Sequence, residues 1–223
     1  MKNLYNALLL KQLYQLKNLG YRYTATKPYR STQEEPLSLP SNLIQLKKQV
    51  QNCHLCPLSK SRERVVFGKG SDDAKLMFIG DYPMAQEEQA EEPFVGRGGE
   101  MLTRMIEQVI GIPRSAVYLS NLLKCHPKQG GAIEPTLLHT CKAYLLQEIA
   151  IVQPRLIIAL GETPYHYLTN EKKPIEEIRG ELISLEGYQL IVTHHPNFLL
   201  KNPSRKKEVF EDLKKIKLLL KQF

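Results

Sequence analysis

The chain has 223 residues, of which 42% are hydrophobic, enough for one well-buried core but too few for two ordinary enzyme domains. Its 31 Lys and Arg against 23 Asp and Glu give a net charge of +8, which favours a polyanionic partner such as nucleic acid. No apolar stretch reaches the roughly 18–20 residues needed to cross a bilayer, and the N-terminus lacks the pattern of a signal peptide. We therefore expect a soluble, cytoplasmic protein without a membrane partner.

The first 40 residues differ in character from the rest of the chain. Leucines recur at roughly helical spacing between residues 1 and 19, and Gly20 then offers a stop, which predicts an amphipathic helix. Residues 21–40 are rich in Thr, Ser, Pro and charge, as is typical of a linker. We expect a helix-and-linker extension over residues 1–40 and the main domain over residues 41–223, with Ser41 capping its first helix.

Four short apolar, β-rich runs follow at intervals of about 40 residues. They are Lys75–Ile79, Val117–Asn121, Arg155–Leu160 and Gln189–Thr193. Helical patterns separate and follow them, at residues 99–110, 136–152, 162–168 and 204–223. This alternation predicts an α/β fold of three layers, α/β/α, with a central, mainly parallel four-stranded sheet.

Polar and turn residues follow the predicted strands. The first strand leads into Gly80–Met84, the second into Asn121–Cys125 and the fourth into His194–Pro196. Ligands of open parallel sheets bind at the carboxyl ends of the strands, where such loops converge. These three loops therefore form one candidate site, although ordinary strand-ending turns produce part of the same pattern.

Four cysteines are too few for a disulfide-dense scaffold. Cys53 and Cys56 form a C-x-x-C pair, and Cys125 and Cys141 follow at a distance. Together they can supply four thiolates to one centre. The ligand set suits zinc and an iron–sulfur cluster alike.

From about Cys53 to the C-terminus the chain resembles the iron–sulfur, or family 4, uracil-DNA glycosylases. The matching segments, in the order of that family, are Cys53–Leu58, Val66–Gly68, Gly80–Pro83, Pro93–Arg97, Asn121–Cys125, Cys141, Arg179–Gly180 and Thr193–Pro196. The resemblance implies that the four cysteines hold a 4Fe-4S cluster. It also implies a monofunctional, monomeric enzyme that excises uracil from DNA in base excision repair and leaves an abasic site.

The same resemblance assigns roles in the site. Phe94 would stack on a uracil flipped out of the duplex, and the Asn121 amide would pair with uracil O4 and N3-H. His195 would stabilise the departing O2 anion, and Asp81 would order the attacking water. The alternatives are a core aromatic for Phe94, a strand-end cap for Asn121 and a structural histidine for His195.

The segment after His195 is expected to contact DNA. Leu199 falls where such enzymes carry a minor-groove wedge, with Leu200 as the less favoured choice. Lys201 and Arg205 would neutralise phosphates. Their alternative is a solvated helix face.

The first motif departs from the family, which usually has Gly-Glu-Ala-Pro-Gly where this chain has Gly80-Asp81-Tyr82-Pro83-Met84. Tyr82 and Met84 add bulk that would exclude the thymine methyl group, shift the substrate or abolish turnover. Glu87 matches a second acidic position of the base pocket, with exposed charge as its alternative. Three rival functions follow: a glycosylase for another deaminated base such as hypoxanthine, a catalytically silent iron–sulfur DNA-binding protein, and a redox protein.

Overall fold

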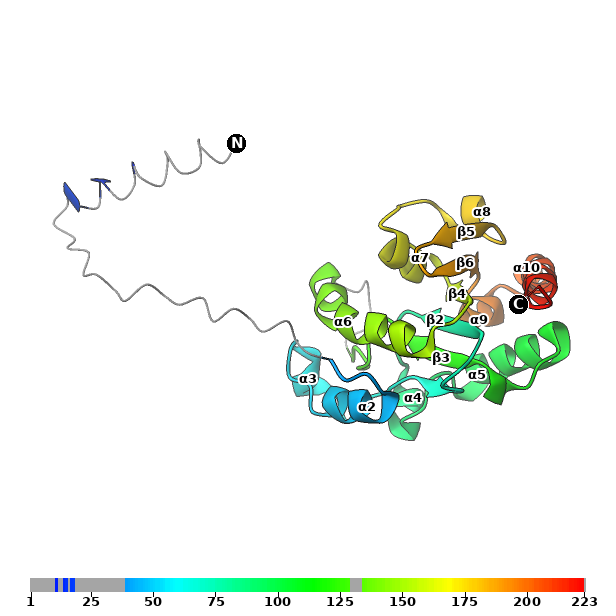
Figure 1. The fold of residues 1–223 in the computed structure, drawn as a ribbon, viewed down its shortest axis with the longest axis horizontal. Helices are drawn as coiled ribbons and strands as arrows, with labels where there is room; N and C mark the ends of the chain where they lie inside the picture. Colours follow the sequence, from blue (N-terminus) through cyan, green and yellow to red (C-terminus); the bar gives the residue numbers. More distant parts are fainter. Residues whose placement is uncertain (1–10, 12–13, 16, 19–38, 129–133, 223) are drawn as a thin grey trace. The chain divides into compact units, whose positions relative to one another are not determined.

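The structure, a computed structural model, describes residues 11, 14–15, 17–18, 39–128 and 134–222. The predicted helix over residues 1–19 and the linker over residues 21–40 lie almost wholly outside this part of the chain. Leu39–Phe223 forms one compact unit (Figure 1). Over the described residues, no helix has both the length and the apolar character needed to traverse a bilayer.

A six-stranded sheet lies at the centre of this unit, in the order β1-β3-β2-β4-β6-β5. Its four middle strands are parallel and correspond to the four predicted runs. They are β2 (Leu76–Gly80), β3 (Tyr118–Asn121), β4 (Leu156–Leu160) and β6 (Tyr188–Thr193). The edge strands β1 (Lys69–Gly70) and β5 (Leu182–Leu185) are antiparallel to their neighbours. The predicted four strands are thus the parallel centre of a wider sheet, because the exposed or half-exposed edges carry no fully apolar run.

The two faces of the sheet bury separate cores, because successive side chains of a strand point to opposite faces. In β2, Met77 and Ile79 belong to one core, and Leu76 and Phe78 belong to the other. The first core is covered by α2 (Leu43–Gln51), α6 (Pro135–Val152), α7 (Glu162–Thr169) and α8 (Ile175–Ile178). The second is covered by α5 (Gly96–Arg104), η1 (Met105–Ile110), α9 (Pro196–Lys201) and α10 (Lys206–Leu220). The predicted three-layer architecture is confirmed (Figure 1).

The predicted helices appear close to their expected bounds, with two differences. The first helix is capped by Asn42 and not by Ser41, since Asn42 Oδ1 accepts the Gln45 N-H at 2.8 Å. The predicted helix over residues 99–110 changes at Met105 from α5 into the π-helical η1. Short segments that were not predicted are α3 (Leu58–Ser61), α4 (Ala85–Ala90), η2 (Arg114–Ala116), α8, α9 and η3 (Pro203–Arg205).

The register of the sheet brings two predicted site loops together. Gly80 lies opposite Asn121 at the carboxyl ends of β2 and β3, and the Leu122 N-H donates to the Gly80 carbonyl at 2.9 Å. A Cβ at Gly80 would lie 2.5 Å from Asn121 Oδ1 and 2.9 Å from Phe94 Cζ. Only glycine therefore lets the Asn121 amide and the Phe94 ring approach this strand end.

Candidate active site

A cavity of about 190 Å³ lies at the carboxyl edge of the sheet. It is lined by Asp81, Tyr82, Met84, Glu87, Phe94, His195, Asn197 and Lys201. The cavity is smaller than a typical site for a drug-sized ligand, which suits one small planar group. A larger cavity of about 510 Å³ lies against β1 and η2. Because that one contains no predicted site residue, size alone does not locate the site.

Asp81 carries a carboxylate that is poorly compensated. Its Oδ1 is buried and has no hydrogen-bond partner within the described residues, and its side chain accepts a hydrogen bond from Thr163. Burial raises the pKa of Asp81 to about 6, although the Thr163 bond opposes the shift. Thr163, at the start of α7, was not predicted, so the loop after β4 also contributes to the site.

His195 also lines the cavity, and its ring is held in one orientation. Its Nδ1 accepts the backbone N-H of Asn197 at 3.1 Å, so the neutral ring carries its proton on Nε2. Burial lowers the pKa of His195 to about 4, which keeps the ring neutral at pH 7. The Phe94 ring lies 6.0 Å from it, centroid to centroid. His195 thus has an N-H donor available beside an aromatic face.

Asn121 has a fixed backbone and an uncommitted amide. Lys124 Nζ donates to its carbonyl at 2.9 Å and pairs with Glu148 at 2.5 Å, in an interior where both charged side chains are almost fully buried. Asn121 itself is 3% exposed, and its Nδ2 has no partner within the described part of the chain. A buried donor without a partner is unusual in a folded protein and needs an explanation.

The two glutamates of the acidic helix α4 are buried, whereas its other four residues are exposed. Glu87 and Glu88 are 6% and 3% exposed, so the alternative of exposed charge for Glu87 is wrong. The Glu87 carboxylate accepts the N-H of Met84 at 2.7 Å and those of Phe94 and Val95. Burial raises the pKa of Glu87 to about 7 against these bonds. Glu87 borders the cavity, but the bonds that it makes are to backbone.

The two bulky residues of the altered first motif both reach the cavity. Tyr82 lines it from a partly exposed position, and Met84 is 45% exposed at its rim. His126 holds the residue between Tyr82 and Met84, since its Nδ1 lies 2.8 Å from the Pro83 carbonyl oxygen. The added bulk therefore narrows the cavity and does not turn away from it.

The expected DNA-contacting residues separate into different environments. Lys201 is exposed and lines the cavity. Leu199 is 1% exposed and packs in the core beneath α9. This burial contradicts the expectation that Leu199 is an exposed wedge, because the turn of α9 directs that side chain toward α5. Leu200 is partly exposed and Phe198 is 40% exposed.

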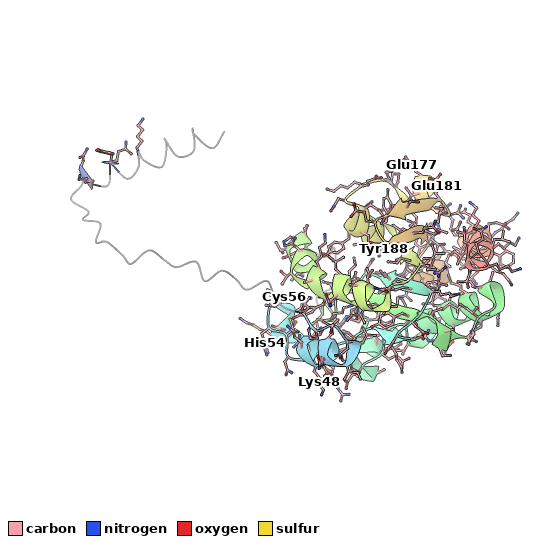
Figure 2. The ribbon with its side chains drawn as sticks, in the orientation of Figure 1. Lys48, His54, Cys56, Glu177, Glu181 and Tyr188 are labelled. Atoms are coloured by element: carbon pink, nitrogen blue, oxygen red, sulfur yellow. The ribbon has the colours of Figure 1, made fainter. Side chains whose placement is uncertain are left out.

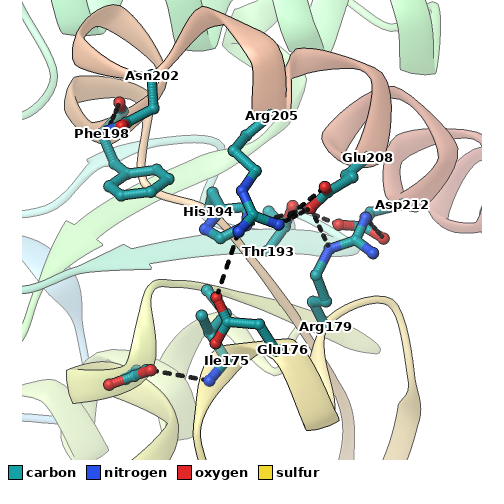
Figure 3. Close-up of polar contacts among 11 residues, drawn as sticks. Ile175, Glu176, Arg179, Thr193, His194, Phe198, Asn202, Arg205, Glu208 and Asp212 are labelled. Carbon is teal, nitrogen blue, oxygen red and sulfur yellow. Dashed lines mark hydrogen bonds and ion pairs between the residues drawn. The ribbon is translucent and has the colours of Figure 1, made fainter.

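Arg205 belongs to a polar network that also includes His194, Arg179 and Asp212 (Figure 3). Its Nη1 donates to both carboxylate oxygens of Glu208 at 2.9 and 3.1 Å. In the same network Arg179 Nη2 lies 3.0 Å from Asp212 Oδ1, and the Thr193 hydroxyl donates to Asp212 Oδ2 at 2.8 Å. Arg205 is therefore already engaged with a carboxylate, unlike Lys201.

The four cysteines line one cavity, together with Arg62 and Tyr144. Cys56 lies at the edge of the unit beside α2 and α3 (Figure 2). Arg62 was not predicted; its Nη1 donates to Cys125 Sγ at 3.3 Å and its Nη2 to the Cys53 carbonyl at 2.7 Å. One guanidinium thus joins the C-x-x-C segment to the loop after β3.

The thiols differ in their burial, and two of them have shifted pKa values. Over the described residues, no three His, Cys, Asp or Glu side chains are grouped so as to hold one metal ion. Burial raises the pKa of the Cys141 thiol to about 12 and also raises that of Cys125. Burial therefore favours the neutral form of these two thiols.

Comparison with known proteins agrees with the fold. The model of the Uracil DNA glycosylase superfamily matches residues 67–214, which places the α/β unit in that class. A type-4 uracil-DNA glycosylase of Thermotoga maritima is 36% identical, over 86% of this chain and 98% of its own. That of Saccharolobus solfataricus is 35% identical, over 79% of this chain and 85% of its own. The chain therefore belongs to the type-4 uracil-DNA glycosylases.

Proposed function

We propose that the protein removes uracil from DNA by hydrolysing its N-glycosidic bond, as the first step of base excision repair. The observation that carries this proposal is a pair of buried groups without partners in the described part of the chain. Asp81 Oδ1 belongs to a residue that lines the small cavity, and Asn121 Nδ2 lies at the strand end beside Phe94. Unpaired buried groups of opposite hydrogen-bonding type suit a base and a water molecule that satisfy them. The family to which the chain belongs supports this reading.

The reaction needs one bond to break and one to form. The flipped uracil stacks on Phe94, and the Asn121 amide pairs with its O4 and N3-H. As the bond from C1′ to N1 breaks, its electron pair leaves with uracil, and the His195 Nε2-H donates to the developing O2 anion. Water then adds to C1′, and the Asp81 carboxylate accepts its proton.

Base release from a duplex with a single uracil tests this proposal. We expect release by the wild-type protein and loss of release in Asp81→Ala and His195→Ala. Lys47→Ala, an exposed change on α2, is the control. Binding of the duplex without release of uracil would overturn the proposal.

The altered first motif raises one second candidate, a glycosylase for another deaminated base such as hypoxanthine, because Tyr82 and Met84 both line the cavity. A matched duplex with hypoxanthine in place of uracil separates the two substrates. Release of hypoxanthine in preference to uracil would assign the altered first motif to a different deaminated base.

For the four thiols, we propose that Cys53, Cys56, Cys125 and Cys141 hold a 4Fe-4S cluster. Such a cluster requires four thiolates, and the cavity brings four together. Four thiolates also suit zinc, at about 2.3 Å from each sulfur, and membership of the type-4 uracil-DNA glycosylases supports the cluster. The bound cluster ties the segment before β1 to the loop after β3 and to α6.

Metal analysis of anaerobically purified protein tests the cluster. We expect about four iron and four sulfide per chain with negligible zinc, and loss of iron in Cys141→Ser. Zinc at one atom per chain without sulfide would overturn the assignment. Because this readout is independent of base release, it does not depend on the catalytic proposal.

For DNA contacts, we propose that Lys201 binds a phosphate beside the cavity and that Leu200 takes the wedge position expected of Leu199. Lys201 is exposed and Leu200 partly so. Arg205 would contact phosphate only by sharing its guanidinium with Glu208. We expect Lys201→Ala to reduce the salt dependence of duplex binding by about one counterion, and Arg205→Ala by less.

We further infer that residues 41–223 suffice for catalysis and act as a monomer. Gel filtration of that fragment, with uracil release measured in each fraction, would test this.

A further inference from the structure

The backbone at Phe94 has a conformation that a bulky residue rarely adopts. Its φ is +55°, in the left-handed region where most side chains are strained. The Phe94 ring is 4% exposed and lines the base cavity. Its direction depends on this backbone, so whatever holds the backbone also aims the ring. Such strain persists only where the surrounding structure determines it.

Two charged side chains hold the Phe94 peptide from its two sides. Glu87 accepts the N-H groups of Phe94 and Val95. Arg114 Nη2 donates to the carbonyls of Pro93 at 3.1 Å and Phe94 at 3.0 Å. The donors and acceptors of this turn are therefore bound by one carboxylate and one guanidinium.

Arg114 is itself fixed by three further contacts. Its Nη1 donates to Thr103 Oγ1 at 3.1 Å, its backbone N-H donates to Glu107 Oε1 at 3.2 Å, and its Nη2 lies 3.9 Å from Glu92 Oε1. The planar guanidinium presents several N-H groups in fixed directions, which an ammonium does not. Arg114 is thus a rigid support, and lysine at this position would not reproduce it.

We propose that Arg114 is a positioning residue that aims the Phe94 ring at the flipped base. Arg114 borders the neighbouring cavity against β1 and is not among the residues that line the base cavity. It therefore acts through Phe94 and contacts no substrate. This inference rests on the proposed function of the cavity, in which Phe94 stacks on uracil.

A double-mutant cycle tests whether Arg114 acts through the ring. We expect Arg114→Ala to slow single-turnover uracil release by about 10- to 100-fold, since a displacement of about 1 Å can cost that much. Affinity for an undamaged duplex should stay within about twofold. In a Phe94→Ala background the same substitution should have no further effect. Additive losses in the double variant, or a wild-type rate in Arg114→Ala, would overturn the proposal.

Two more variants separate positioning from folding. Arg114→Lys keeps the charge but not the fork, and we expect it to be slow although folded, with added guanidinium restoring the rate of Arg114→Ala but not that of Phe94→Ala. Arg64→Ala is the matched control, because Arg64 forms an exposed pair with Glu91 at 2.8 Å. A full rate in Arg114→Lys would contradict the need for the fork.

Fluorine NMR of protein with 4-fluorophenylalanine at residue 94 gives a readout without catalysis. We expect one resonance in the wild type and in Arg64→Ala, and a shifted or broadened one in Arg114→Lys. An unchanged resonance in Arg114→Lys would overturn the positioning role. If the wild type released no uracil, the proposed function would fail while this measurement still tested the contact.

Discussion

The two adjacent histidines of the last predicted motif face regions of opposite character. His195 borders the base cavity, where Asp81 Oδ1 and Asn121 Nδ2 have no partners within the described residues. His194 faces the network of Figure 3, stacks on Phe198 at 4.8 Å, and lies 3.7 Å from a Glu208 oxygen. One residue along the chain therefore separates a cavity with unpaired groups from a network of ion pairs. In that network Arg179 Nε and His194 Nε2 have no hydrogen-bond partner within the described residues, but they lie 3.6 and 3.7 Å from a Glu208 oxygen.

The groups of the cavity are suited to catalysis, whereas the groups of the network support the fold. In the cavity, burial without full compensation raises the pKa of Asp81 and lowers that of His195, so both groups are primed for an added ligand. In the network, Arg179 and Arg205 meet the carboxylates of Asp212 and Glu208. We expect substitutions in the cavity to change rate and substitutions in the network to change stability.

The largest expected effect tests the reactive side of this comparison. His195→Ala removes the Nε2-H donor to the uracil anion, and we expect single-turnover release to fall by about 10²- to 10³-fold. Affinity for the uracil duplex, measured by fluorescence anisotropy, should change little. Equal losses in rate and affinity would show that His195 binds DNA and does not stabilise the departing base.

The next largest expected effect tests whether the network of Figure 3 stabilises the fold. Arg179→Met leaves the Asp212 carboxylate, 2% exposed, without its guanidinium partner, and we expect a loss of about 2–4 kcal/mol of unfolding free energy. The exposed pair of Arg64 and Glu91 is the control, and Arg64→Met should cost less than about 1 kcal/mol. Urea unfolding under anaerobic conditions measures both. Equal losses would remove the distinction between the network and an ordinary surface pair.

The pH dependence of release tests which carboxylates act in the cavity. Burial raises the pKa of Glu87 to about 7 and of Asp81 to about 6, and both groups are expected to act as carboxylates. The rate constant should therefore fall below about pH 7 and more steeply below about pH 6, by about tenfold per pH unit for each group. The residual rate constant of Asp81→Asn should show only the upper step, near pH 7. Because the pKa of His195 is lowered to about 4, a rate that falls as the pH rises from 5 to 8 would contradict this assignment.

The parts of the fold that sequence predicts are those with strong local signals. Three of the four parallel strands are fully buried and the fourth, β6, is buried from Leu190 onward. Asp81 and His195 come after strands, and Asn121 ends one. Parallel strands bring such positions to one edge. The cysteines could be grouped because all four lie near the family's motifs.

The parts of the fold and the site that the sequence does not predict depend on tertiary contacts. Arg114, Thr163 and Arg62 are single polar residues whose partners lie on other elements, and no local pattern marks them. Leu199 has the right distance from His195 along the chain, but its burial is set by the packing of α9 against α5. The edge strand β1 is two residues long and exposed, which leaves no periodicity to detect.

The smallest effect has the opposite sign from the others. The pKa of Asp81 is raised from 3.8 to about 6 in the folded chain, so its ionisation destabilises the fold, increasingly from about pH 4 to pH 6 and fully above that. Asp81→Asn removes the charge and should raise the unfolding free energy by about 1–2 kcal/mol at pH 8, with no gain at pH 4. Urea unfolding at the two pH values measures the difference. If Asp81→Asn is more stable but releases no uracil, the cavity retains an unfavourable charge for catalysis. If it is less stable at pH 8, the Asp81 carboxylate is a structural partner like those of the network.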